Sequence, residues 1–345
     1  MSHMTSILLA NTAPMIGHLQ AYDNDLTAII PDLYEGLDLV SRELVGFIPS
    51  VFRDSNAERA AVGQSVVYTT PTKGTGFNVT PAMVTPEPGD FTVDTGSLTI
   101  SKAKGYNFGW TGEQQRSVAT SVGYVSIQAS MFAEALRDLV NEIETDVAAE
   151  AYKSASRAIG TAGTTMTLRQ GELLDIHGFS LKESAGVQTH TKGTGTSHQL
   201  SAAAAVGATA LSVDTGSGTI LAGDVITLAG DTNKYVVETA LAGGVVTIAK
   251  PGLRVAAADN TVITVGNNFT GNVALTRRSV HLITRAPALP NGGDSAIDSM
   301  MLTDPRSGLS FEVRLYAGYR KIRAEVTSAW GVGAVKPEDI ALLLG

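Results

Sequence analysis

A run of about 30 residues, 126–156, constrains this chain most, because it contains neither glycine nor proline and repeats apolar residues every four positions. The apolar residues of this repeat are Ile127, Met131, Ala135, Leu139, Ile143, Val147 and Ala151, flanked by Phe132, Leu136 and Val140. The spacing predicts one amphipathic helix. With a rise of 1.5 Å per residue, it would be about 45 Å long and could form the backbone of a subunit.

The segment before this helix predicts an arm, a shorter helix and a long hairpin. Residues 1–27 show no periodicity, which favours an arm ordered only against a partner. From Pro31 to Pro49, Leu33, Leu37, Val40, Leu44 and Phe47 recur at helical spacing. Alternating residues then predict a β-hairpin over 62–113. Its middle, 72–88, is poor in apolar residues, so we expect the hairpin to rest on another chain.

The second half of the chain is rich in strands. Between 199 and 266, short β-rich runs alternate with glycine turns about every ten residues, which predicts an inserted antiparallel barrel or sandwich. The runs are 210–213, 225–228, 235–237, 245–248 and 262–265. A buried strand is expected at 173–179, and further strands at 280–283, 309–315 and 322–326, before a helical turn that opens at Pro337. The fold class is therefore α+β.

Composition excludes several classes of function. With 25 Lys and Arg against 33 Asp and Glu, the net charge is -8, which disfavours a protein that reads DNA sequence. The absence of cysteine excludes disulfides, thiolate zinc sites, iron–sulfur clusters and a cysteine nucleophile. No apolar run reaches the roughly 18 residues of a membrane-spanning helix, so we expect a soluble protein made in the cytoplasm.

We find no motif that predicts catalysis, a cofactor or a metal. In Lys73-Gly74-Thr75-Gly76 the glycines follow the lysine, which reverses the order of a phosphate loop and favours a flexible loop. Gly293-Asp294-Ser295 lies in a polar loop without the turn of a serine nucleophile. Asp175 and His177 alternate along a predicted strand and could supply two metal ligands, although a structural histidine is commoner.

An acidic stripe follows the long helix, formed by Glu134, Asp138, Glu142, Asp146 and Glu150 at intervals of four. Like charges at this spacing repel by a few tenths of a kcal/mol per pair. The stripe is either a solvated face or a seam against cations, such as Arg277 and Arg278 or a neighbouring subunit.

Several segments resemble one known family, the major capsid proteins of tailed bacteriophages. The matching residues are Pro31-Asp32-Leu33-Tyr34, 41–47, 107–115 with Gly112-Glu113-Gln114-Gln115, 174–179, and Asp304-Pro305 followed by 307–313. The chain is similar to the branch with the fold named after phage Hong Kong 97 and a β-barrel insertion, as in coat proteins of short-tailed enteric phages.

The resemblance implies a subunit of an icosahedral shell that encloses DNA, first as a procapsid. Residues 1–61 would be an arm and helix, 62–113 the extended loop, 114–166 the peripheral domain with its spine helix, 167–198 and 267–345 the axial domain, and 199–266 the insertion domain. Partners would be copies of itself as pentamers and hexamers, scaffolding and portal proteins, and packaged DNA without sequence-specific contact. Lys73, Phe77, Glu142, Asp146, Arg277 and Arg278 are candidate assembly contacts.

Two alternatives and one departure accompany this resemblance. A β-rich phage tail, decoration or surface-binding protein would also carry a small barrel, but has little use for a 30-residue helix. An enzyme ranks below this alternative, because the sequence shows no nucleophile together with a catalytic base. Relatives carry many more residues between the spine helix and the strand at 173–179. We therefore expect a shortened axial domain, or a sequence joined across absent residues between Gly160 and Leu168.

Overall fold

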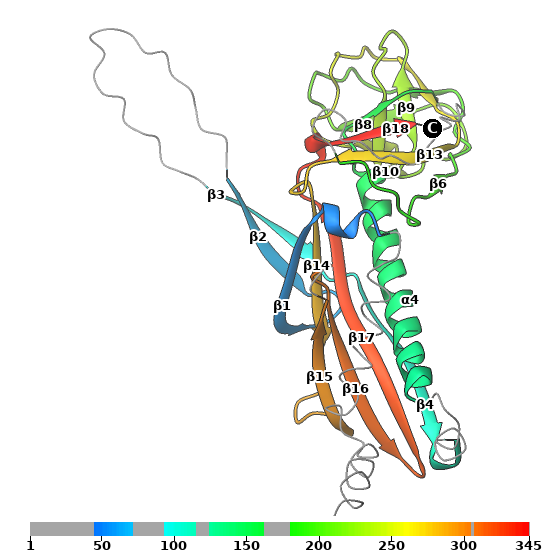
Figure 1. The fold of residues 1–345 in the computed structure, drawn as a ribbon. Helices are drawn as coiled ribbons and strands as arrows, with labels where there is room; N and C mark the ends of the chain where they lie inside the picture. Colours follow the sequence, from blue (N-terminus) through cyan, green and yellow to red (C-terminus); the bar gives the residue numbers. More distant parts are fainter. Residues whose placement is uncertain (1–44, 72–92, 115–123, 162–179, 305–306, 345) are drawn as a thin grey trace, which may run out of the picture.

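The computed structural model describes residues 45–71, 93–114, 124–161, 180–304 and 307–344. These residues form a large sheet, a long helix α4, a closed β-barrel, a four-stranded sheet and a two-stranded hairpin. Figure 1 shows α4 lying along the large sheet, with the barrel beyond its C-terminal end. The mixed α+β class and the barrel are confirmed. The predicted arm and most of the helix from Pro31 lie outside the described residues.

Helix α4, Tyr124–Lys153, matches the helix predicted over 126–156. Its inward face includes Phe132, Leu136, Leu139, Ile143 and Val147, all fully buried. Met131 belongs to the predicted apolar repeat but is 40% exposed. Residues four positions apart are rotated by about 40° relative to each other around the helix axis. A row of residues at this spacing therefore winds slowly around the helix, and Met131, near the start of the row, lies off the buried face.

The large sheet runs in the order β1-β14-β17-β16-β15. Strand β4 also pairs with β17, along the edge of β17 opposite to β16. Its strands are β1 Phe52–Ala60, β4 Lys102–Thr111, β14 Val280–Pro287, β15 Ala296–Thr303, β16 Ser310–Gly318 and β17 Lys321–Ala334. Neighbouring strands are antiparallel except β1 and β14. The face towards α4 contributes Phe311, Val313 and Trp330 to the main core. The predicted strands at 280–283, 309–315 and 322–326 are therefore confirmed.

The hairpin predicted over 62–113 is wrong beyond Thr99. The hairpin itself is β2, Ser65–Pro71, and β3, Val93–Thr99, paired along their whole length. Strand β4 turns back into the large sheet, where Lys102 pairs with Trp330 and Thr111 with Lys321. The alternation of Tyr106, Phe108 and Trp110 signals a strand but not its partner, because the partner lies far along the chain. Strand β1 likewise corrects the expectation that residues 1–61 hold only an arm and helix.

The barrel closes in the order β10-β11-β8-β7-β12-β9. Its strands are β7 His198–Leu200, β8 Ala210–Asp214, β9 Val225–Leu228, β10 Tyr235–Ala242, β11 Val245–Ile248 and β12 Val262–Val265. A separate core that includes Leu211, Ile226, Val246 and Ile263 fills it. Glycine and asparagine turns between short β-branched runs made these boundaries readable from the sequence.

A four-stranded sheet, β5-β18-β13-β6, lies beside the barrel. Its strands are β5 Arg157–Ile159, β6 Thr189–His190, β13 Phe269–Leu275 and β18 Ile340–Leu344. The turn expected at Pro337 is the 3₁₀ helix Pro337–Asp339, which leads into β18. Two expectations fall outside the described residues. These are the strand at 173–179 and most of the discontinuity expected between Gly160 and Leu168.

Candidate functional site

The root of the β2–β3 hairpin is fixed by close packing on β17. Leu98 and Val66 pack against a small cluster that contains Ile100, Ile283 and Ala329. A Cβ atom at Gly331 would lie 2.3 Å from the carbonyl oxygen of Thr99, and real Cβ atoms do not approach so closely. A bare glycine backbone at this point of β17 therefore allows the hairpin to cross the sheet.

Beyond its root, the hairpin is open to solvent. Val67 is 67% exposed and Val93 is 47% exposed, and the alternate positions Ser65, Thr69 and Ser97 are exposed as well. Figure 1 shows β2 and β3 extending away from the body of the molecule. Because a two-stranded hairpin is marginally stable in water, this geometry favours a contact with another molecule.

The acidic stripe of α4 faces cations of its own chain. The ammonium of Lys102 lies 2.8 Å from Asp146 Oδ1 and 3.2 Å from Glu142 Oε1, and that of Lys104 lies 2.6 Å from Glu142 Oε1. Trp330 Nε1 donates to Asp146 Oδ2 at 2.8 Å. Burial alone would lower the pKa of Lys102, but its hydrogen bonds to Asp146 and Glu142 and their charges outweigh burial and raise it. Part of the stripe is therefore an internal seam.

Of the two alternatives for the stripe, the seam against cations is found for Glu142 and Asp146, but its cations are Lys102 and Lys104 and not the suggested Arg277 and Arg278. Both arginines lie in the turn between β13 and β14, where Arg278 Nε is 3.7 Å from Asp339 Oδ2. The sequence contained a signal for the actual partners of Glu142 and Asp146. Lys102 and Lys104 lie two residues apart and so face the same side of a strand. Lys73 and Phe77 lie outside the described residues. The role of all six candidates as contacts between subunits stays a prediction.

Sequence reasoning missed a buried carboxylate, Glu144, that ties three segments together. Its side chain is 2% exposed and accepts hydrogen bonds from the backbone N–H groups of Gly46, Phe47 and Ile48 at 2.7, 2.7 and 2.9 Å. The Ser184 hydroxyl donates to the same carboxylate. These donors lie far from Glu144 in the chain, so no local pattern announces them.

A second missed network joins the barrel to the body. Asp224, fully buried in the barrel, lies 2.8 Å through Oδ1 from Nε2 of His190 in β6. The same carboxylate accepts the backbone N–H groups of Gly193 at 3.0 Å and Leu221 at 2.7 Å. Tyr152, in the last turn of α4, stacks near His190 with ring centroids 5.7 Å apart. The network fixes the barrel against the end of the helix.

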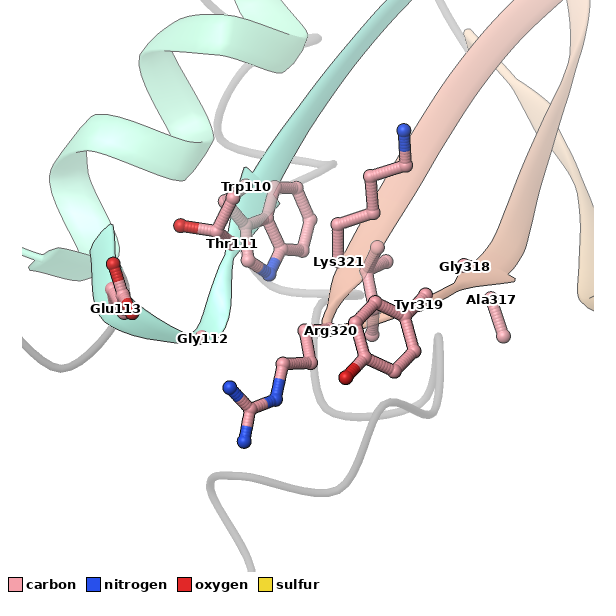
Figure 2. Close-up of a pocket in the computed structure, with 10 residues that line it drawn as sticks. Trp110, Thr111, Gly112, Glu113, Ala317, Gly318, Tyr319, Arg320 and Lys321 are labelled. Carbon is pink, nitrogen blue, oxygen red and sulfur yellow. The ribbon is translucent and has the colours of Figure 1, made fainter.

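The far end of the large sheet carries an open cavity of about 740 Å³ (Figure 2). Trp110 and Gly112 at the end of β4 form one side, and the turn between β16 and β17 forms the other, with Tyr319 90% exposed. Trp110 Nε1 is buried and has no hydrogen-bond partner among the described residues. Figure 2 shows this nitrogen directed into the space next to Tyr319 and Arg320.

Of the chemical motifs considered in the sequence, Gly293-Asp294-Ser295 has structural surroundings, whereas Lys73-Gly74-Thr75-Gly76 and the pair Asp175 and His177 lie outside the described residues. Asp294, of the Gly-Asp-Ser triplet, is 2.5 Å from Arg314 Nη2 and accepts the Tyr316 hydroxyl at 2.9 Å. Burial, the hydrogen bond to Asp294 and the nearby carboxylate of Glu325 raise the pKa of Tyr316 to about 12, although the charge of Arg314 opposes this rise. Within the described ranges, no three potential ligands gather as a metal site would require. No helix in the same ranges is long and apolar enough to cross a bilayer.

Comparison with known proteins gives matches among solved structures alone. No family model and no curated protein matches the sequence. The cyanophage P-SCSP1u capsid is similar with a TM-score of 0.40 and 9% identity, over 88% of this chain and 89% of that chain. The mature capsid of bacteriophage PhiM1 gives 0.36 and 9%, over 87% and 86%. An empty GTA particle capsid gives 0.36 and 11%, over 88% and 90%. These titles name the class of protein that the sequence resembles.

Proposed function

We propose that this chain is a structural subunit that assembles into the icosahedral shell around phage DNA, first as a procapsid that then matures. The observation that carries the proposal is the β2–β3 hairpin. It is rooted tightly in the subunit, but beyond the root its strands expose valines and lack a third strand. A shell subunit has a use for such an arm, because a neighbouring subunit can cover it.

In this proposal each part of the fold has a place in the shell. The hairpin is the extended loop and the barrel is the insertion domain. Strands β14 to β17 lie within 267–345, the range expected for the axial domain, but they share one core with α4, so we assign them with α4 to the peripheral domain. The four-stranded sheet β5-β18-β13-β6 belongs to the axial domain. The cavity beside Trp110 and the 90% exposed Tyr319 would be a second contact between copies.

The proposed partners follow from the same picture. Copies of the chain form pentamers and hexamers, helped by scaffolding and portal proteins, and the assembled protein resides in the virion after assembly in the bacterial cytoplasm. The net charge of -8 is compatible with a shell that encloses DNA but does not bind it tightly over the shell's whole inner surface.

The test places a charge on the hairpin. Val67→Glu puts a carboxylate on a strand side chain that is 67% exposed in the subunit, so folding should be preserved. If a neighbour covers this face, the buried charge prevents shell closure, and electron microscopy shows soluble subunits or small oligomers. Val206→Glu, at a barrel position 64% exposed, is the matched control and should still close.

Replacing residues 72–88 by a short turn is a second, independent variant, and it should have the same effect as Val67→Glu. Normal shells from both hairpin variants would contradict the proposed role of the hairpin. Circular dichroism and a urea midpoint equal to the parent protein's would show that the subunit itself is intact.

A further inference from the structure

A second cavity, of about 330 Å³, lies between the barrel and the four-stranded sheet. One wall is β5 with its flanking residues, from Ser156 to Gly160. The opposite wall is the turn that enters β10, from Thr232 to Tyr235, and Arg254 completes the lining. The cavity has the size of a small-ligand site and draws its walls from three separate segments of the chain.

The charge of this cavity is opposite to that of the chain. Among the described residues that line it, Arg157, Lys234 and Arg254 are cations, and none carries a carboxylate. Neither guanidinium forms an ion pair within the described part of the chain. In a protein with a net charge of -8, such a gathering in a concavity raises the local concentration of anions.

The nearest carboxylate is already engaged. Asp231 accepts the Tyr235 hydroxyl at 2.6 Å through Oδ2, and the backbone N–H of Asn233 at 2.9 Å through Oδ1. Burial would raise the pKa of Asp231, but these hydrogen bonds and the charge of Arg254 hold it below its usual value. The carboxylate is thus fixed by the turn.

The Lys234 ammonium and the backbone of Arg254 are held in place before any ligand arrives, whereas Arg157 and Arg254 themselves are exposed residues. The Tyr235 hydroxyl accepts the backbone N–H of Arg254 at 3.0 Å, which anchors that residue at the rim. Lys234 Nζ donates to the carbonyl oxygen of Gly160. Gly160 has a φ of 96°, and a Cβ there would lie 2.9 Å from the carbonyl oxygen of Leu344, so only glycine presents its carbonyl in this way. Prior ordering of this kind lowers the entropic cost of binding.

We infer that this cavity binds a phosphate group, held by Arg157 and Arg254 with Lys234 beside them. Since ionised Asp231 lies near Arg254, the three cations leave a local excess of about two positive charges, which a phosphate with up to two negative charges and several acceptor oxygens matches better than a single carboxylate does. The planar guanidinium matches two of those oxygens at once. The group could belong to the backbone of packaged DNA or to free phosphate. The inference goes beyond shell formation and does not require it.

Titration calorimetry on the unassembled full-length chain tests the inference directly. Inorganic phosphate is titrated at constant ionic strength set by sodium chloride, so that a general salt effect is removed. We expect saturable binding that weakens about tenfold or more in Arg157→Gln and, separately, in Arg254→Gln. Arg137→Gln is the matched control, because it removes one positive charge from α4, outside the residues that line the cavity, and should bind as the parent does.

A second titration with an oligothymidylate distinguishes the source of the phosphate. Binding that is lost in the same two variants assigns the site to a nucleic-acid backbone, and binding of inorganic phosphate alone assigns it to the free anion. The inference is overturned if neither probe binds at millimolar concentration, or if both cavity variants bind like Arg137→Gln. Because Arg157 and Arg254 come from different segments, misfolding of one variant leaves the other as a test.

Discussion

Replacement of Glu144 by glutamine should destabilise the subunit more than any change on the exposed side of α4. The substitution keeps the size of the side chain but removes its charge and turns one acceptor oxygen into a donor amide. Three backbone N–H groups and one hydroxyl point at this carboxylate. At least one of these donors would then face another donor inside the protein.

The magnitude follows from the bonds that change. Hydrogen bonds to a charged group contribute about 1.5–3 kcal/mol and neutral ones about 0.5–1.5 kcal/mol, so each retained bond weakens by about 1 kcal/mol. The donor left without an acceptor costs about 1–3 kcal/mol more, because the site is buried. The total loss of unfolding free energy should be about 4–6 kcal/mol, which overlaps the range of about 3–5 kcal/mol seen when a buried ionic contact is broken.

Urea unfolding of unassembled subunits measures the loss, and Glu134→Gln is the matched control. Glu134 is 65% exposed and pairs only with Arg137 in the described structure, so its replacement should cost less than about 1 kcal/mol. Hydrogen exchange should also show faster exchange of the amides of residues 46–48 in Glu144→Gln alone. Equal stability of the two variants, with those amides still protected, would refute the role assigned to Glu144.

Three further predictions concern the seam, the barrel and the hairpin root. Lys102→Met should lower the unfolding free energy by about 1 kcal/mol at neutral pH, since the ion pair is partly exposed. In urea unfolding, this difference from the parent should persist up to the ordinary lysine pKa and vanish only as pH rises through the raised pKa of Lys102. A difference that is already absent at pH 9 would contradict this sign. Residues 199–266 expressed alone should give dispersed amide signals by NMR, because the barrel has its own core; a random-coil spectrum would argue against this. Gly331→Ala should lower stability by about 1–3 kcal/mol through its clash with Thr99, whereas Gly271→Ala, whose added Cβ would meet its nearest atom at 3.5 Å, should change it less, as unfolding midpoints can show.

Sequence patterns predicted those parts of the fold whose information is local. Helix α4 and the strands of the barrel came from periodicity within one segment, and their bounds agree closely with the structure. Strand β15 was missed because neither of its faces is consistently apolar: Ile297 and Met301 are exposed at 50% and 41% beside Ser299, and Asp298 lies on the more buried face. Strand β18 was missed because Ile340–Leu344 is a short continuous apolar run, whose pattern does not distinguish a strand from a helix.

The candidate site depends on contacts that no local pattern contains. The hairpin was extended to residue 113 because Tyr106, Phe108 and Trp110 continue the alternation, while their partner β17 is distant in sequence. Glu144 lies outside the regular stripe of α4, and nothing in its neighbours shows that the backbone of Gly46–Ile48 would reach it. The pairing of Asp224 with His190 similarly joins a barrel turn to a strand of another sheet.

Cryo-electron microscopy of particles assembled from the purified chain tests the central claim most directly. We predict closed icosahedral shells in which the β2–β3 hairpin of each subunit lies on a neighbouring subunit and covers the exposed side of Val67. Persistent monomers under all assembly conditions, or shells in which the hairpin contacts only its own subunit, would contradict the account, and monomers would favour a tail, decoration or surface-binding protein instead.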